Sequence, residues 1–170
     1  MSEVFSFPRT VNESAARTVA AGVVVLCALI LLTQWHILLL VLAYGFVARV
    51  LTGPTLSPLG QFATRVVVPT LSLPDRPTSG APKRFAQGIG ATLSLSAVVA
   101  WLAGASAVAN VLVAMILVAA SMEAALGFCL GCAIFAQLIR LGVVSEDVCV
   151  DCADISNRIL VNQAETTSTH

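Results

Sequence analysis

Four cysteines near the C-terminus have a spacing that could do chemistry. They form two Cys-x-x-Cys pairs, Cys129 with Cys132 and Cys149 with Cys152. Two thiols three positions apart on a helix or turn point the same way, so a pair can close a disulfide or hold one edge of a metal ion. A lone acid in apolar sequence, Glu123, precedes the first pair. These five residues are the candidate site.

One hypothesis is thiol redox or sulfur relay, which would make the chain a thiol–disulfide oxidoreductase. Cys129 and Cys132 would exchange with Cys149 and Cys152 by thiolate attack through a mixed disulfide. Glu123 would accept or donate the proton. A carboxylate in apolar sequence is costly unless it is protonated, paired or hydrated, so a structural ion pair with Arg49 or Arg84 is the alternative for Glu123.

Zinc is the second hypothesis for the cysteines. The pattern Cys-x2-Cys-x16-Cys-x2-Cys fits a two-knuckle zinc site, with Cys129, Cys132, Cys149 and Cys152 as ligands. The protein would then be a zinc-stabilised structural or adaptor protein. Four reduced cysteines without a joint role remain a further alternative. A small-molecule transporter built around Glu123 is less favoured, because the chain shows no internal repeat.

The surroundings of both pairs disfavour thiolates. Phe128 and Leu130 flank the first pair, and apolar neighbours raise the pKa of a thiol. The second pair lies among acids, including Asp151, whose charge also opposes ionisation.

The composition is that of a membrane protein. The chain has 170 residues, of which 58% are hydrophobic and only 11% charged, whereas soluble domains have about 25% charged residues. The mean hydropathy is +0.93. The net charge is zero, so no basic surface for nucleic acid is expected. The lipid bilayer is the expected environment.

Four apolar stretches predict an all-α polytopic protein with four transmembrane helices in two hairpins. They cover 15–33, 37–51, 87–103 and the region from about 107, which Glu123 interrupts and which continues to 139. Asn12 is a plausible N-cap for the first helix. Small residues in the third span favour close helix contacts, namely Gly88, Gly90, Ala91, Ser94 and Ala97.

A proline-rich connection, 52–85, should be mostly irregular, with a short interfacial helix at 59–68. The expected division is a transmembrane domain at 1–142, a cytoplasmic cysteine-containing segment at 143–160 and a disordered tail at 161–170.

The positive charges predict the orientation. All nine Lys and Arg residues fall at the N-terminus, in the second connection or at the C-terminus, and none lies in the other two connections. Short loops rich in Lys and Arg stay on the cytoplasmic side of a membrane, so both termini should lie on the cytoplasmic side of a bacterial inner membrane. At 1.5 Å per helical residue, Cys129 lies about 33 Å from Ala107, at the cytoplasmic edge of the bilayer. Cytoplasmic thiols stay reduced, which argues against a permanent disulfide.

Several blocks between about residues 5 and 142 resemble a known bacterial membrane family, "domain of unknown function 4395". They are Phe7-Pro8, Val11-Asn12-Glu13, Arg49 with Gly53-Pro54, Lys83-Arg84-Phe85-Ala86-Gln87-Gly88, and Glu123 with Gly127-Phe128-Cys129-Leu130-Gly131-Cys132.

The resemblance implies a small multi-span protein and singles out Glu123, Cys129 and Cys132, while the tail pair lies outside the matching blocks. The layout is also similar to membrane thiol oxidoreductases that use a quinone, by analogy of architecture alone. A thioredoxin-like or sulfurtransferase partner and a homo-oligomer are further expectations.

Overall fold

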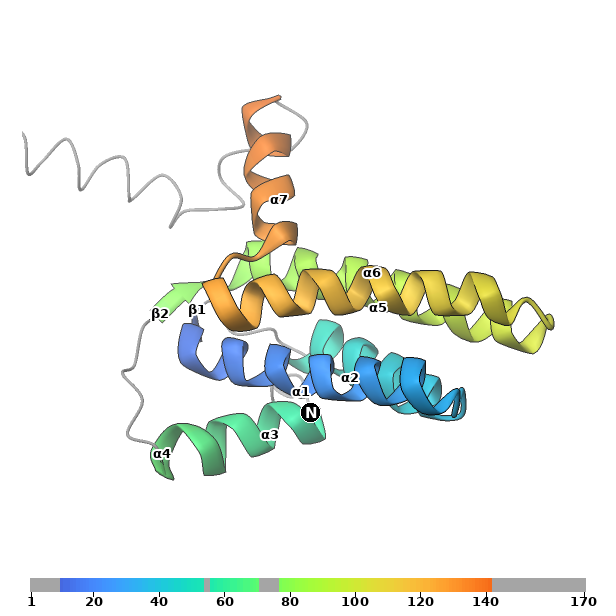
Figure 1. Cartoon of the computed structure of the whole chain (residues 1–170). Helices are drawn as coiled ribbons and strands as arrows, with labels where there is room; N and C mark the ends of the chain where they lie inside the picture. The colour runs from blue at the N-terminus through green and yellow to red at the C-terminus, as the bar shows by residue number, and fades with distance from the viewer. Residues whose placement is uncertain (1–9, 54–55, 71–76, 142–170) are drawn as a thin grey trace, which may run out of the picture.

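The computed structural model describes residues 10–53, 56–70 and 77–141, and within them the chain is almost entirely helical (Figure 1). The predictions for Cys149, Cys152 and the segments beyond 141 concern residues outside the described ranges. The elements are β1 (Thr10–Asn12), α1 (Glu13–Thr33), α2 (Leu38–Thr52), α3 (Pro58–Phe62), the π-helical turn η1 (Ala63–Val67), α4 (Val68–Thr70), β2 (Pro77–Ser79), α5 (Gly80–Leu102), α6 (Ser106–Leu126) and α7 (Leu130–Arg140).

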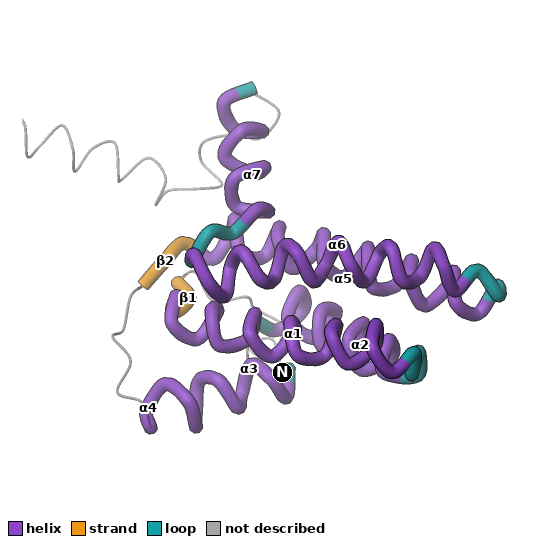
Figure 2. The backbone as a smooth tube through the Cα atoms, viewed as in Figure 1, coloured by secondary structure: helices purple, strands orange, loops and turns teal. Residues whose placement is uncertain are grey.

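Two helical hairpins form the body of the molecule. Short turns join α1 to α2 and α5 to α6 at the same end of the bundle (Figure 2). α1 packs on α6 and α2 on α5, around a core that includes Ile30, Leu39 and Val113. At the opposite end, β1 pairs antiparallel with β2 and holds the starts of α1 and α5 together.

The outer surface of the bundle is apolar. Three helices, α1, α5 and α6, are long and apolar enough to cross a membrane, and α2 is a shorter apolar helix. Leu32 is 83% exposed, Val99 66% and Val111 61%. Contiguous apolar surface of this kind is unfavourable in water and favourable in lipid. The chain is therefore organised as a multi-pass membrane protein.

The helix starts follow from local chemistry. The predicted N-cap is confirmed, because the Asn12 side chain accepts a hydrogen bond from the Ser14 amide at 2.8 Å. The predicted start of the third span at 87 is wrong, because α5 already begins at Gly80. Pro82 does not prevent this, since the first turn of a helix has free amides and tolerates proline.

The short helix predicted at 59–68 is confirmed and extends over 58–70, as α3, η1 and α4. The widened turn of η1 precedes Pro69, whose ring would clash with the carbonyl group four residues earlier in a regular α-helix. Leu59 packs against Gly22, about midway along α1. This segment therefore lies beside the first half of α1.

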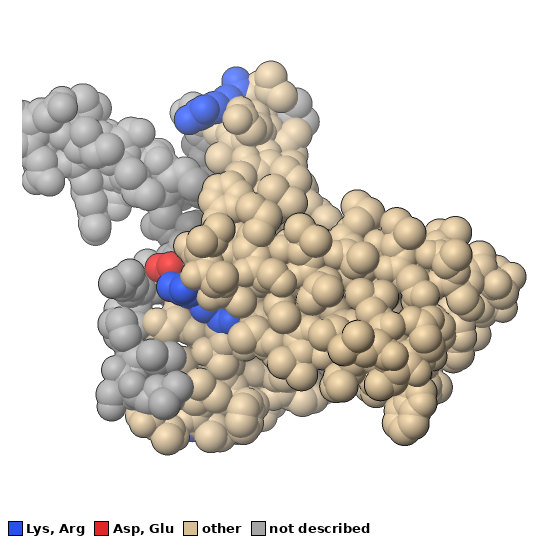
Figure 3. Space-filling view, viewed as in Figure 1, with Lys and Arg blue, Asp and Glu red and all other residues tan. Residues whose placement is uncertain are grey.

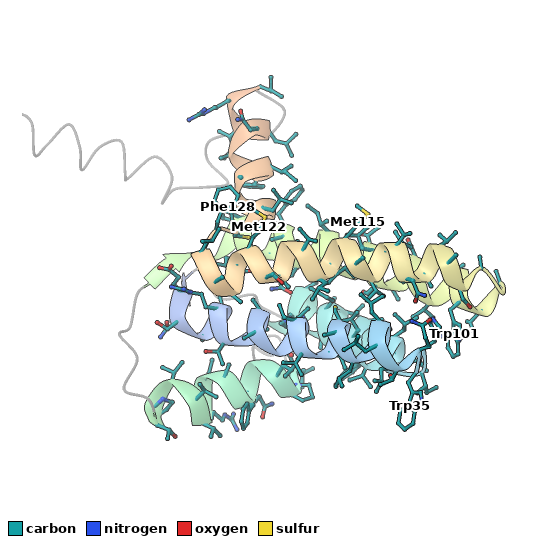
Figure 4. All side chains as sticks on the ribbon, in the orientation of Figure 1. Trp35, Trp101, Met115, Met122 and Phe128 are labelled. Carbon is teal, nitrogen blue, oxygen red and sulfur yellow. The ribbon has the colours of Figure 1, made fainter. Side chains whose placement is uncertain are left out.

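Polar contacts tie the two hairpin turns together. His36 Nε2 and Asn110 Oδ1 are 3.1 Å apart, and Asn110 Nδ2 donates to Gln34 Oε1 at 2.9 Å. The His36 ring also stacks on Trp101. Trp35 and Trp101 both lie at this end of the bundle (Figure 4). Trp at the end of an apolar bundle suits the lipid–water interface.

Small residues on α5 allow α2 to approach closely. Gly90, Ala91, Ser94 and Ala97 are buried, as predicted, but Gly88 is not. A Cβ atom on Gly90 would lie 2.8 Å from Phe46 Cζ and closer still to other atoms of that ring. Gly90 is therefore required for the contact between α2 and α5.

We expect Gly90→Ala to destabilise the protein by about 1–3 kcal/mol, because the aromatic ring has to move to admit the methyl group. Gly88→Ala is the matched control, since a Cβ atom there meets nothing within 4 Å, and it should be neutral or stabilising by up to about 1 kcal/mol. Thermal unfolding in detergent measures both. Equal midpoints for the two variants would contradict the close packing at Gly90.

Candidate functional site

The first cysteine pair lies at a break between two helices. The prediction of one apolar segment continuing from 107 to 139 is wrong: α6 ends at Leu126, and Gly127 takes a left-handed conformation with φ +68°. Glycine adopts this conformation without strain and commonly terminates helices. Cys129 is then the N-cap residue of α7, which turns away from the bundle (Figure 1).

The break leaves the expected position of the pair almost unchanged. The 21 residues of α6 correspond to about 31 Å at 1.5 Å per residue, which is already the thickness of the hydrocarbon core. Cys129 follows directly after this length. Phe128 and Met122 lie at this same end of the bundle (Figure 4).

α7 packs against the first turns of α5. A Cβ atom on Gly131 would lie 2.6 Å from Ala86 Cα, so only glycine allows the two backbones to approach this closely. Phe135, which is buried, packs against Phe85 with ring centres 5.4 Å apart. These contacts hold the thiols beside the first turns of α5.

Glu123 is part of a buried ion pair with Lys83. Lys83 Nζ and Glu123 Oε1 are 2.9 Å apart, and the two side chains are 9% and 17% exposed. The predicted partners, Arg49 and Arg84, do not form this ion pair, although the charge of Glu123 still acts on Arg49. Lys83 was assigned to the loop, and the early start of α5 places it on the helix that faces Glu123.

Arg49 is also buried, at 5% exposure, but it contacts neutral groups. Its Nε donates to Gln87 Oε1 at 2.9 Å and its Nη1 to Ser57 Oγ at 3.4 Å. The guanidinium carbon lies 4.6 Å from the centre of the Phe46 ring. Arg84 Nε donates to the Val50 carbonyl at 3.1 Å.

A cavity of about 250 Å³ brings several of these groups together between α1, α2, α5, α6 and the start of α7. Its polar lining includes Cys129, Glu123, Arg49 and Gln87. Sequence reasoning missed Lys83 and Gln87. Two signals were available: Gln87 begins the predicted third span with Lys83 just before it, and both residues stand in the Lys83–Gly88 block that resembles the family.

The two thiols differ in acidity, contrary to the expectation that apolar flanks raise both pKa values. The Cys132 thiol can donate a hydrogen bond to a Cys129 thiolate, which lowers the pKa of Cys129 against the effects of burial and of Glu123; Lys83 acts in the same direction as Cys132. The same hydrogen bond and burial raise the pKa of Cys132. A position at a helix N-terminus also favours a thiolate. Cys129 is therefore the better nucleophile of the pair.

All three described cysteines are free thiols. Cys27 is fully buried in α1 among apolar residues, as expected for a small core residue. Within the described ranges, no group of three or more His, Cys, Asp or Glu side chains could hold a metal ion. A four-cysteine zinc site would need Cys149 and Cys152, which lie outside those ranges.

Charged side chains are concentrated at the end of the bundle that carries the site. In the face shown in Figure 3, most of the blue and red groups lie at the end near β1 and on α7, and the opposite end of the bundle, with the two hairpin turns, is uncharged. Arg17, at this end, donates to the carbonyl groups of Ala124 and Ala125 at the end of α6, at 3.2 and 3.0 Å.

We expect Glu123→Gln to destabilise the protein by roughly 3–5 kcal/mol, because it leaves the Lys83 ammonium buried without a counter-charge. The double variant Lys83→Met/Glu123→Met is the control, since apolar residues of similar size often replace a buried pair at little cost. Thermal unfolding in detergent compares them. A double variant as unstable as the single one would show that the charges are needed for more than mutual neutralisation.

We expect alkylating reagents to label Cys129 faster than Cys132 near neutral pH, because the lower pKa of Cys129 gives it more thiolate. As the pH is raised, the labelling rate of Cys129 should begin to increase at a lower pH than the labelling rate of a cysteine in an unstructured peptide. Cys132→Ala should move this pH profile upward, whereas Cys132→Ser, which keeps a hydroxyl donor, should move it less. Peptide mass spectrometry locates the label. Faster labelling of Cys132 would refute this assignment.

Comparison with known proteins gives one match. Residues 11–140 match the family described as "Domain of unknown function (DUF4395)". No curated protein and no solved structure matches this chain. The matched range covers α1 to α7, with Lys83, Glu123 and the first cysteine pair, and it accounts for more than half of the chain. The chain therefore belongs to the DUF4395 family, in agreement with the resemblance in its sequence blocks.

Proposed function

We propose that the protein is a membrane thiol relay in which Cys129 and Cys132 exchange electrons or sulfur with a second dithiol. The observation that carries the proposal is the position of the pair: Cys129 is the N-cap residue of α7, Cys132 follows in its first turn, and the two thiols lie close enough for Cys132 to donate a hydrogen bond to Cys129. The attacking thiol must be ionised to the thiolate before it reacts, whereas the resolving thiol can stay protonated until the mixed disulfide has formed.

The exchange begins when the Cys129 thiolate attacks one sulfur of a partner disulfide. A mixed disulfide forms, and the other partner sulfur leaves as a thiolate. Cys132 then loses its proton and attacks the Cys129 sulfur, so that the Cys129–Cys132 disulfide forms and the partner dithiol is released. Glu123, whose charge acts on both thiols, is the proposed proton acceptor.

The natural partner within the chain is the second pair, Cys149 and Cys152. Seven residues lie between the last described residue, Leu141, and Cys149, so that eight residue steps span at most about 28 Å of extended chain. The second pair is thus tethered close to the first. A soluble thioredoxin-like or sulfurtransferase protein would pass electrons or sulfur to or from this tail.

We propose that the three long helices α1, α5 and α6 and the shorter helix α2 all cross the inner membrane and that both termini are cytoplasmic. α2 has 15 residues, about 22 Å at 1.5 Å per residue, and the flanking residues are needed for a full crossing. Positive charges near the start of α1 (Arg17), in η1 (Arg65) and in the first turns of α5 (Lys83 and Arg84) support a cytoplasmic face there. A membrane-impermeant maleimide applied to intact cells should leave Cys149 and Cys152 unlabelled. Labelling from outside would reverse the orientation.

The alternative is a structural zinc site formed by Cys129, Cys132, Cys149 and Cys152, in a protein that acts as an adaptor. The spacing of the four cysteines supports it. Elemental analysis of the purified protein separates the two functions. Stoichiometric zinc that is lost in a Cys149→Ser/Cys152→Ser variant would replace the thiol relay by the zinc site.

We predict that mild oxidation of the reduced protein protects Cys129 and Cys132 from maleimide, because they become a disulfide. In Cys132→Ser, Cys129 should instead be trapped in a mixed disulfide with Cys149 or Cys152, because the resolving thiol is absent. Mass spectrometry without reduction detects both, and it distinguishes a disulfide from a persulfide by the extra sulfur atom. Cys27→Ser is the control and should leave the pattern unchanged. If neither pair becomes protected, the thiol relay is refuted.

A further inference from the structure

The cavity beside Cys129 has the composition of a site for an apolar ligand. Its walls come from four helices of the bundle and the start of α7, and they are mostly aliphatic, with the Phe46 ring among them. Its volume of about 250 Å³ is enough for one substituted ring.

The polar groups on the cavity wall offer hydrogen-bond donors. Arg49 has no acceptor atoms, so Gln87 must present its carbonyl oxygen to the guanidinium, and its NH₂ group is then available to donate elsewhere. The guanidinium has five N–H groups, and its hydrogen bonds to Gln87 and Ser57 use two of them. Among the described residues Arg49 forms no ion pair. The polar part of the wall therefore suits a ligand with carbonyl oxygens.

Access to the cavity is from the lipid side. Met115, which lines the cavity, lies on α6 midway along the bundle and is 53% exposed (Figure 4). Leu130 and Ile134 of α7 also line it and are 43% and 41% exposed. A molecule dissolved in the bilayer meets these side chains before it meets water.

We propose that this cavity binds the ring of a lipid-soluble quinone, with a ring carbonyl accepting from Arg49 and Gln87 and the ring next to Cys129. The proposal rests on the thiol relay and names its electron acceptor. Cys129 and Cys132 lose two electrons and two protons and form a disulfide, and the quinone takes up both to become the quinol. The thiol exchange then runs in reverse: a thiolate of the partner dithiol attacks the Cys129–Cys132 disulfide, the second partner thiol resolves the mixed disulfide, and the partner leaves as a disulfide while Cys129 and Cys132 are reduced again. Glu123, on the same wall, is placed to carry a proton.

A fatty acid is the competing ligand, because its carboxylate would also pair with Arg49. A quinone is favoured because the wall combines the donors with a thiol. A carboxylate next to Glu123 would also place two negative groups in one apolar cavity.

The binding experiment uses the full chain in lipid nanodiscs with the variant Cys129→Ser/Cys132→Ser, so that binding is measured without thiol chemistry. The probe is a quinone with a photoreactive azido group on its ring, and peptide mass spectrometry locates the crosslinks. Excess decylubiquinone is one competitor, chosen because its ring is fully substituted and cannot add a thiol. Oleate is the other.

We expect crosslinks on residues of α5 and α6 that line the cavity, displaced by decylubiquinone and not by oleate. Arg49→Gln should reduce crosslinking by roughly tenfold or more, since a hydrogen bond to a charged donor is removed. Ala119→Leu fills the cavity from α6 and keeps Arg49 in the chain, and it should reduce crosslinking as well, so the test does not depend on an arginine variant that folds poorly. Gly88→Ala, away from this cavity, is the control.

Crosslinks that neither variant reduces would overturn the quinone site. Displacement by oleate at equal concentration would assign the cavity to a fatty acid. Electron transfer is tested separately: the reduced wild-type protein should convert decylubiquinone to its quinol, and Cys132→Ser should not. Quinone binding without quinol formation would support the binding site and contradict the role of the quinone as electron acceptor. If the Cys132→Ser variant traps no mixed disulfide while the quinone probe still binds, the thiol relay is refuted and the quinone site is not.

Discussion

A buried ion pair determines how the ends of two helices meet in this protein. Separately, the Lys83 ammonium and the Glu123 carboxylate would each be very costly in an apolar bundle, and in contact they neutralise each other. The contact fixes the first turns of α5 against the last turns of α6. Because α7 docks on the same turns of α5 through Gly131, the ion pair also determines where the cysteines lie.

The other basic residues at this end satisfy backbone carbonyl groups. Arg17 donates to the last turn of α6, and Arg84 donates to the last turn of α2. The C-terminal end of a helix has unpaired carbonyl groups and a partial negative charge, so a cation there satisfies both. The same side chains supply the positive charge from which the orientation in the membrane is inferred. Orientation and helix termination thus depend on one set of residues.

Much of the fold could be predicted from the sequence because lipid imposes a simple pattern. Long apolar stretches, the Asn12 cap and the small residues of α5 follow from composition and spacing, and they were predicted. The start of α5 was not, because proline usually ends a helix and only its position in the first turn makes Pro82 harmless. The end of α6 was also missed. Gly127 lies in uninterrupted apolar sequence, and a glycine there does not reveal whether the helix continues or stops.

The candidate site was predictable in its residue types and not in its contacts. Cys129, Cys132 and Glu123 are conspicuous because thiols and an acid are rare in apolar sequence. The partner of Glu123 depends on where α5 begins, so an error in that helix boundary gave the wrong cation. The difference in pKa between the thiols could not be read from their flanking residues, since it arises mainly from the hydrogen bond between the two thiols themselves.

Gly127 has a mechanical consequence for the chemistry beside it. The carboxylate of Glu123 belongs to α6 and both thiols belong to α7, so the residues that join the two helices are the only covalent link between the acid and the sulfur atoms. A change in the backbone torsions of Gly127 would rotate α7 as a unit and keep the cysteines together. The same rotation would carry Leu130 and Ile134 away from the cavity wall. Such a rotation would open the cavity towards lipid and separate the thiols from their proton acceptor in one motion, and it would have to break the contact of Gly131 with Ala86 that holds α7 on α5.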